Sequence, residues 1–256
     1  MGRGLTLALQ EAGVEATLLD RTRRSEDTLR AALVLIAVPD DAIGEVAAAI
    51  AAGHAVGERH VVLHLSGLLD RHALRALAAT GAALGSFHPL QSIADPSTAS
   101  VRLRGAFAGL EGDDRALETG ERLAGALGMH PVRLAPGAKA AYHAGAVIAS
   151  NYVVVLASVA EGLAREAGVP PAQARALYLP LMQGTVGNLA LGPAAALTGP
   201  VRRGDAATVR RHLAALTPAD RALYRALGLV ALAVAREAGL GAAPAAAVER
   251  ALTDEA

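Results

Sequence analysis

Cysteine and tryptophan are both absent from this 256-residue chain, and aromatic residues make up only 2% of it. The absence of cysteine excludes disulfides, thiolate metal ligands and a cysteine nucleophile. Neither charge is in excess, since 24 basic residues balance 24 acidic ones. We therefore expect no excess of basic residues that would bind nucleic acid or an anionic membrane, and we expect a small-molecule partner.

The sequence also lacks a charged segment followed by an apolar run of the kind that targets a chain for export. The longest apolar stretch, from Ala144 to Ala160, is shorter than the ~20 residues of a membrane span and is interrupted by Ser150 and Asn151. We expect it to form a helix buried in a core or a dimer interface, in a soluble cytoplasmic protein. The 53% hydrophobic content supplies the core, and the length allows one large or two medium domains.

Apolar runs alternate with helix-length segments as far as about residue 135. This alternation indicates βαβ units and a mainly parallel sheet, and we predict a Rossmann-like α/β domain over residues 1–135. Ligands bind outside the carboxyl ends of the strands in such sheets. The residues expected at those ends are Val38, Pro39, Asp40, Ser66, Gly67 and His88.

The N-terminus predicts a helix over about residues 2–12, followed by a short strand over residues 16–20. The apolar strand and the first two glycines that normally precede such a helix have no counterpart. Gly2 takes the position of the third glycine, and with Arg3 it can hold phosphate at the helix start. Asp20 follows at close to the spacing of a ribose ligand. Because Asp20 favours NAD whereas Arg21 and Arg23 favour the extra phosphate of NADP, we predict NADP and keep NAD as the alternative.

Residues 136–256 carry helical patterns only, so we predict a second, all-α domain there. At ~100° per residue, the side chains of Lys139, His143 and Ser150 fall within about 40° of one another on its first helix, with Asn151 at the edge of that stripe. An ammonium, an imidazole and a hydroxyl on one stripe suit catalysis, although His143 alone is equally a core histidine. His88 is a further candidate because its ordinary pKa lies near neutrality. We see no metal-ligand spacing among the eight histidines.

Several segments resemble one bacterial protein family across nearly the whole chain. They are SFHPLQSIAD, YHAGAVIASNY and LTGPVRRGD, and they are similar to proteins that pair a Rossmann-like NADP-binding domain with a domain of unknown function, DUF2520. That family is in turn similar to pyrroline-5-carboxylate reductase, ketopantoate reductase and the 3-hydroxyisobutyrate and 6-phosphogluconate dehydrogenases. The resemblance implies a helical domain that forms a homodimer, and hydride transfer at the cleft between the domains. It also implies that Lys139 contacts the substrate, whereas Asn151 departs from the usual spacing.

The leading hypothesis is therefore an NADP(H)-dependent oxidoreductase that acts on a small keto or imino acid, with Lys139 or His143 as the proton donor. The competing hypothesis is a regulatory or scaffold protein that binds NADP(H) without turnover.

Overall fold

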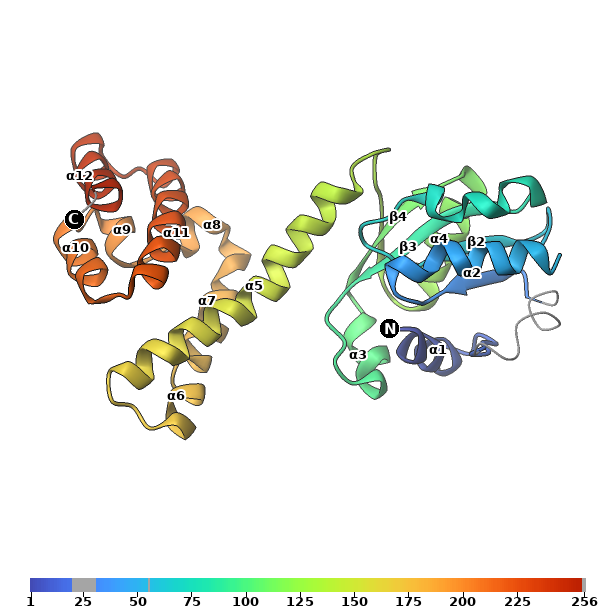
Figure 1. Ribbon diagram of the computed structural model, residues 1–256, viewed down its shortest axis with the longest axis horizontal. Helices are drawn as coiled ribbons and strands as arrows, with labels where there is room; N and C mark the ends of the chain where they lie inside the picture. The colour runs from blue at the N-terminus through green and yellow to red at the C-terminus, as the bar shows by residue number, and fades with distance from the viewer. Residues whose placement is uncertain (20–30, 55, 255–256) are drawn as a thin grey trace. The chain divides into compact units, whose positions relative to one another are not determined.

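The computed structural model describes residues 1–19, 31–54 and 56–254 (Figure 1). The chain divides into two compact units, Met1–Tyr152 and Val153–Ala256, which are described separately. Helix α5 (Lys139–Glu166) contains the boundary between them. Asp20, Arg21 and Arg23, which are predicted to bind the cofactor, lie outside the described residues.

The first unit is built on one five-stranded sheet with the order β1-β2-β3-β4-β5. Three of its pairings are parallel, and only β3 and β4 are antiparallel. This confirms the prediction of a mainly parallel α/β sheet. The strands are β1 (Leu33–Ile36), β2 (Val61–His64), β3 (Ala83–Leu90), β4 (Phe107–Gly112) and β5 (His130–Arg133), and the helices are α1 (Gly2–Glu11), α2 (Asp40–Ala52), η1 (Arg71–Thr80), η2 (Pro96–Thr98), α3 (Ala99–Leu103) and α4 (Asp114–Ala126).

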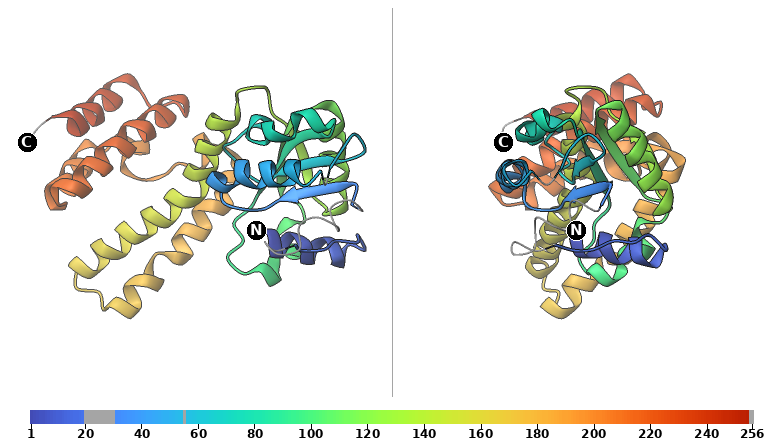
Figure 2. Two further views of the ribbon diagram at one scale, coloured as in Figure 1. Left: turned by 45° about the vertical axis from the view of Figure 1, so that its right-hand side comes forward. Right: turned by 90° about the vertical axis from the view of Figure 1, so that its right-hand side faces the viewer.

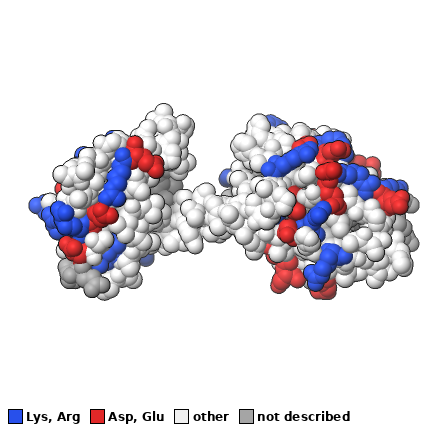
Figure 3. Space-filling view, turned by 90° about the horizontal axis from the view of Figure 1, so that it is seen from above, with Lys and Arg blue, Asp and Glu red and all other residues white. Residues whose placement is uncertain are grey.

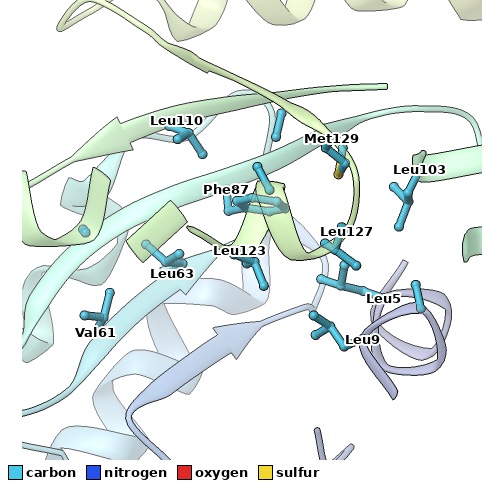
Figure 4. Packing of buried hydrophobic residues seen from close by; sticks show 14 of the residues in the cluster. Leu5, Leu9, Val61, Leu63, Phe87, Leu103, Leu110, Leu123, Leu127 and Met129 are labelled. Carbon is cyan, nitrogen blue, oxygen red and sulfur yellow. The ribbon is translucent and has the colours of Figure 1, made fainter. Parts of the chain in front are cut away.

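The sheet has a hydrophobic cluster on each face, because successive side chains of a strand point to opposite sides. Val61 and Leu63 of β2 join a cluster with α1 and α4 (Figure 4). Val62, between them, joins the other cluster with α2 and η1. Figure 2 shows these three layers where the sheet is seen end-on. The apolar residues Val61–Leu63 of β2 are therefore explained by burial on both faces.

Strand β1 is an edge strand in the part of the chain that the structure describes, since its one pairing is with β2. The predicted strand over residues 16–20 does not form within its described part, because residues 14–19 have no ladder partner.

The second unit is entirely helical in its described residues and has its own apolar core, which includes Val209, Leu232 and Val248. Pro180 stands at the start of a helix that follows a break, as its missing N–H favours. The helices are α6 (Pro171–Leu177), α7 (Leu179–Asn188), η3 (Leu189–Leu191), α8 (Pro193–Ala196), α9 (Gly199–Arg203), α10 (Ala206–Ala215), α11 (Pro218–Glu237) and α12 (Ala242–Thr253).

The apolar run of α5 is exposed in the single chain, so the predicted core alternative is not seen and the dimer-interface alternative stays a prediction. Val154 is 70% exposed and Ile148 60% exposed, and Tyr152, Val153, Val155 and Leu156 are exposed as well. By length and composition α5 is the one described helix that is apolar enough to span a membrane, and its apolar window is not buried within the chain. The hydrophobic cores described for the two units do not include these residues.

Candidate functional site

Lys139, the first residue of α5, places its side chain at the carboxyl edge of the sheet. Its Nζ donates to the carbonyl oxygen of Ser66 at 2.6 Å and to Oγ of Ser86 at 2.8 Å. Ser66 lies just beyond β2 and Ser86 lies inside β3, so one ammonium links the end of β2 and the middle of β3 to α5. The Lys139 side chain is almost completely buried, with 2% of the residue exposed.

Ser66 connects this ammonium to the neighbouring turn after β1. Its Oγ donates to Oδ2 of Asp40 at 2.7 Å and accepts from the backbone N–H groups of Leu68 and Leu69. Asp40 is the first residue of α2, where the helix dipole favours a carboxylate. The predicted strand-end residues Asp40 and Ser66 are therefore brought together in one hydrogen-bonded network with Lys139.

His88 and His143 meet over Gly67. Their ring centroids are 5.9 Å apart at a steep interplanar angle of 81°. A Cβ added to Gly67 would lie 2.5 Å from Nδ1 of His143 and 2.9 Å from Nε2 of His88. Because any side chain at this position would collide with both rings, glycine is required for the histidines to approach the backbone.

Tyr142 orients His88, and the sequence patterns did not single it out. Its hydroxyl lies 3.0 Å from Nδ1 of His88, and the two rings pack edge to face with centroids 5.6 Å apart. The tyrosine fits against β4 because Gly109 has no side chain: a Cβ there would lie 2.7 Å from the Tyr142 hydroxyl oxygen. The signal available in the sequence was the spacing, since Tyr142 follows Lys139 by three residues and shares its side of the helix.

One ring nitrogen in this cluster has no partner among the described residues. Nδ1 of His143 is buried and makes no hydrogen bond. A buried polar atom without a partner is costly, at about 1–3 kcal/mol, and is uncommon outside functional sites. His143 Nδ1 and His88 Nε2 both approach the same backbone position at Gly67.

Burial shifts the protonation of the cluster toward neutral side chains. Removal from water lowers the pKa of Lys139 to about 8, although the carboxylates of Glu111, Asp40 and Asp70 oppose that change. Burial, with the positive charges of Lys139 and His143, lowers the pKa of His88 to about 4. His88 is therefore neutral at pH 7. Burial also raises the pKa of the Tyr142 phenol, so its hydroxyl keeps a proton to donate to Nδ1 of His88.

His64 has a structural role. It is fully buried, its Nε2 bonds the carbonyl oxygen of Asp70 at 2.9 Å, and its Nδ1 accepts from the backbone N–H of Ser66. Both ring nitrogens are used inside the loop after β2. The histidine thus holds Ser66 in place and has no free nitrogen for a ligand.

The other predicted site residues lie outside the cluster formed by Lys139, His88 and His143. Gly2 starts α1 beside Ala37, and the N–H groups of the first turn have no side-chain cap. Arg3, Val38 and Pro39 lie near the same edge of the sheet, and Arg3 and Pro39 are exposed. Ser150 and Asn151 are also exposed, and at ~1.5 Å per residue they lie about 10 Å or more along α5 from His143. The structure does not bring these two side chains to Lys139.

Comparison with known protein families matches both parts of the chain. Residues 16–89 match the Rossmann-like domain, and residues 106–231 match the domain of unknown function DUF2520. The chain joins a Rossmann-like domain to a DUF2520 domain. The segments that carried the resemblance in the sequence lie largely within this DUF2520 match. No curated protein matches the chain in sequence.

Solved structures share the fold of this Rossmann–DUF2520 chain. Protein TM1727 of Thermotoga maritima is 28% identical, with a TM-score of 0.67 over 80% of this chain and 78% of that one. A Bacteroides fragilis protein, BF3122, to which NADP oxidoreductase activity has been ascribed, is 19% identical, with a TM-score of 0.66 over 91% and 93%. The NADP-bound pyrroline carboxylate reductase of Plasmodium falciparum is 11% identical, with a TM-score of 0.57 over 99% and 95%.

Proposed function

We propose that this protein is an NADP(H)-dependent oxidoreductase that reduces the C=O or C=N bond of a small keto or imino acid. The observation that carries the proposal is the cluster at the carboxyl edge of the sheet, where a buried ammonium and two imidazoles surround Gly67. The named activities of the similar structures, an NADP oxidoreductase and a pyrroline carboxylate reductase, support the same class of reaction.

The residues near α1 fit a dinucleotide in part. The uncapped N–H groups at the start of α1 suit a phosphate, and Gly2 allows backbone to come close to Ala37. Val38, Pro39 and Asp40 lie at the end of β1, where the nicotinamide half binds in this class of sheet. We assign Asp20, Arg21 and Arg23 to the ribose and its 2′-phosphate, which makes NADP the proposed cofactor and NAD the alternative. When bound, the cofactor supplies a hydride to the substrate carbon.

We assign the proton transfer to His143 and a supporting electrostatic role to Lys139. Nδ1 of His143 is without a partner and lies next to the backbone of Gly67, whereas two of the Lys139 N–H groups are used by Ser66 and Ser86. As hydride reaches the substrate carbon, the oxygen or nitrogen gains negative charge and takes a proton from His143. The nearby ammonium stabilises that charge mainly in the transition state. The products are a hydroxy acid or an amino acid and the oxidised cofactor.

His88 contributes a neutral hydrogen-bond donor to the substrate. We assign the Tyr142 hydroxyl as the donor to Nδ1, which leaves the single ring proton of neutral His88 on Nε2, the nitrogen that faces Gly67. This donor suits the carboxylate of a keto or imino acid. Ser150 and Asn151 are assigned only a secondary contact with substrate because they lie further along α5.

We further propose that the functional form is a homodimer in the cytoplasm, with residues 1–135 as the cofactor domain and residues 136–256 as the domain that dimerises. The exposed apolar side chains of α5, such as Val154 and Ile148, supply the surface. Charges of both signs are mixed on the face seen in Figure 3, without a single-sign patch that would suit nucleic acid.

The experiment is an NADPH oxidation assay with a panel of keto and imino acids, combined with calorimetric titration of NADPH. We expect micromolar binding and acceleration by at least one acid, with loss of turnover but not of binding in His143→Gln. Binding without turnover for any acid, and with no effect of His143→Gln, would instead support a regulatory NADP(H)-binding protein.

A further inference from the structure

The segment LTGPVRRGD has no part in the proposed reaction, and it borders a pocket of about 630 Å³. All residues that line this pocket belong to the second unit. They come from α8, from the two ends of α9 and from the turn between α11 and α12, helices that are labelled in Figure 1. The volume lies in the range of sites for small organic molecules, so the lining decides what the pocket can bind.

The lining carries positive charge and no negative charge. Arg202 and Arg203 are its two ionisable side chains, and the other lining residues are alanines, leucines, glycines and one threonine. Neither guanidinium forms an ion pair with a carboxylate in the part of the chain that the structure describes. The pair therefore presents two positive charges that an anionic ligand can neutralise.

Arg202 is already oriented at the wall of the pocket. Its Nη2 donates to the carbonyl oxygen of Ala238, just after α11, at 3.0 Å, and the residue is partly buried. A guanidinium has five N–H donors in a rigid fork, so this bond uses one of them and leaves the others for a ligand. A side chain that is fixed in advance loses less conformational entropy on binding.

Asp205, the acidic residue nearest to Arg203 in the sequence, does not neutralise it. The two carboxylate oxygens of Asp205 accept from the backbone N–H and the hydroxyl of Thr208, as the cap of α10. These hydrogen bonds, with a smaller contribution from the charge of Arg203, hold the pKa of Asp205 below its ordinary value. The carboxylate is thus engaged at the helix start, and the exposed Arg203 does not form an ion pair with it.

The uncharged part of the lining suits the remainder of such a ligand. Thr198 brings a hydroxyl that can donate to an anion. A Cβ added to Gly199 or Gly239 would meet no atom within 4 Å, so the space beside the backbone is open there. Leu197 and Leu240 add apolar surface. The pocket therefore combines a charged end with walls that fit a short carbon chain.

We propose that this pocket binds a small organic phosphate, with Arg202 and Arg203 on the phosphate group and Leu197 and Leu240 against the carbon chain. A phosphate monoester carries about −1.5 to −2 charges at pH 7, which matches two guanidinium groups, whereas a carboxylate carries one. The planar fork of arginine also fits phosphate oxygens in pairs. The proposal does not rest on the proposed reaction, because the pocket lies within the second unit and requires no cofactor.

Titration of the full chain with propyl phosphate, without NADPH and at constant ionic strength, tests the proposal. The NMR signals of the Gly199, Gly239 and Gly241 amides report occupancy of the pocket. Arg203→Gln removes one charge, and its matched control is Arg210→Gln in α10, an exposed residue outside the lining. We expect saturable shifts in the wild type, at least tenfold weaker binding in Arg203→Gln and less than a twofold change in the control. Absence of saturable shifts, or equal weakening in both variants, would overturn the proposal.

A second arm compares ligands on the wild type, so that it does not depend on the folding of a variant. Butyrate has the same three-carbon chain as propyl phosphate but a single negative charge, and inorganic phosphate has the charge without the chain. We expect at least tenfold weaker binding of butyrate and measurably weaker binding of inorganic phosphate. Equal binding of butyrate would overturn the assignment of a phosphate, and equal binding of inorganic phosphate would overturn the assignment of an organic ligand.

Discussion

The Nζ of Lys139 lies 2.6 Å from the carbonyl oxygen of Ser66, a residue 73 positions earlier in the chain. This contact fixes the start of α5 to the loop after β2, and it brings Tyr142 and His143, on the next turn, to His88 and Gly67. The cluster therefore depends on one buried ammonium for its assembly.

Lys139→Met is expected to change the alkaline part of the stability profile. The folded-state pKa of about 8 is lower than the ordinary value of 10.5, so between these pH values the unfolded chain binds the proton and the folded chain does not. The free energy of unfolding of the wild type therefore rises with pH across this window, by at most about 3 kcal/mol. Urea unfolding at pH 7.5, 9 and 10 measures this change in the free energy of unfolding. In Lys139→Met the rise should be smaller, and an identical rise in both proteins would contradict the burial of the charge.

His88→Asn tests whether His88 stays neutral at acidic pH. Because the pKa of His88 is lowered from 6.5 to about 4, the folded wild type resists protonation between these values. The free energy of unfolding should therefore fall as the pH is lowered from 6.5 to 4, and the part due to His88 is at most about 3 kcal/mol, reduced because the ring is partly exposed. Subtracting the free energy of unfolding of His88→Asn from that of the wild type at each pH isolates the contribution of His88. Parallel profiles would show that His88 titrates normally.

Gly67→Ala is expected to disable the site with a limited loss of stability. The new Cβ would approach Nδ1 of His143 to 2.5 Å and Nε2 of His88 to 2.9 Å, so both rings must move. Overpacking of this kind costs about 1–3 kcal/mol. The matched control is Gly44→Ala in α2, where a Cβ finds only the carbonyl oxygen of Ala73 at 3.9 Å. We expect the control to retain activity and to unfold at the same or a higher temperature, and an equal loss in both variants would argue against a special role for Gly67.

Tyr142→Phe removes the hydroxyl that faces His88 while it keeps the ring packed on Gly109. Loss of one neutral hydrogen bond costs about 1 kcal/mol of stability. Without that donor the ring proton of His88 is free to move to Nδ1, so we expect a larger effect on substrate KM than on NADPH affinity. Steady-state kinetics with varied substrate and calorimetry with NADPH separate the two. A change in NADPH affinity alone would place Tyr142 in the cofactor site instead.

Much of the first unit could be predicted from the sequence because β2 and β3 are largely buried and the strands end at recognisable turns. The positions of Asp40 and Ser66 just after β1 and β2 followed from parallel strand topology, whereas His88, predicted at a strand end, lies within β3. The partners of Lys139 could not be predicted, because Ser86 lies inside a strand pattern and only the register of β2 with β3 places it beside Ser66. Tyr142 was missed for the same reason: its role depends on Gly109 in a strand that runs antiparallel to β3.

The helical periodicity was less informative about α5. The angular calculation placed Ser150 on the same stripe as Lys139 and His143, but it gave no information on distance along the axis. The apolar run was predicted to be buried in a core or in a dimer interface, and Val154 is 70% exposed in the single chain. A sequence pattern shows that a surface must be covered, and it does not show whether the same chain covers it.

Val154→Glu tests the proposed dimer surface on α5. A charge in an interface core is costly, so we expect this variant to elute and scatter light as a monomer at concentrations where the wild type is a dimer. Val101→Glu in α3 is the matched control, since Val101 is 75% exposed and belongs to the first unit. The control should remain a dimer. A monomeric wild type, or dissociation of both variants alike, would contradict the assignment.

The central claim is tested most directly by the single-turnover rate of NADPH oxidation in wild type and in His143→Gln. The account predicts that at least one keto or imino acid accelerates oxidation in the wild type. It also predicts that His143→Gln slows this step by at least a hundredfold, in the range of general acid catalysis, while NADPH affinity stays within about twofold. Equal rates in the two proteins, or tight NADPH binding with no acid accelerating oxidation in either protein, would contradict it.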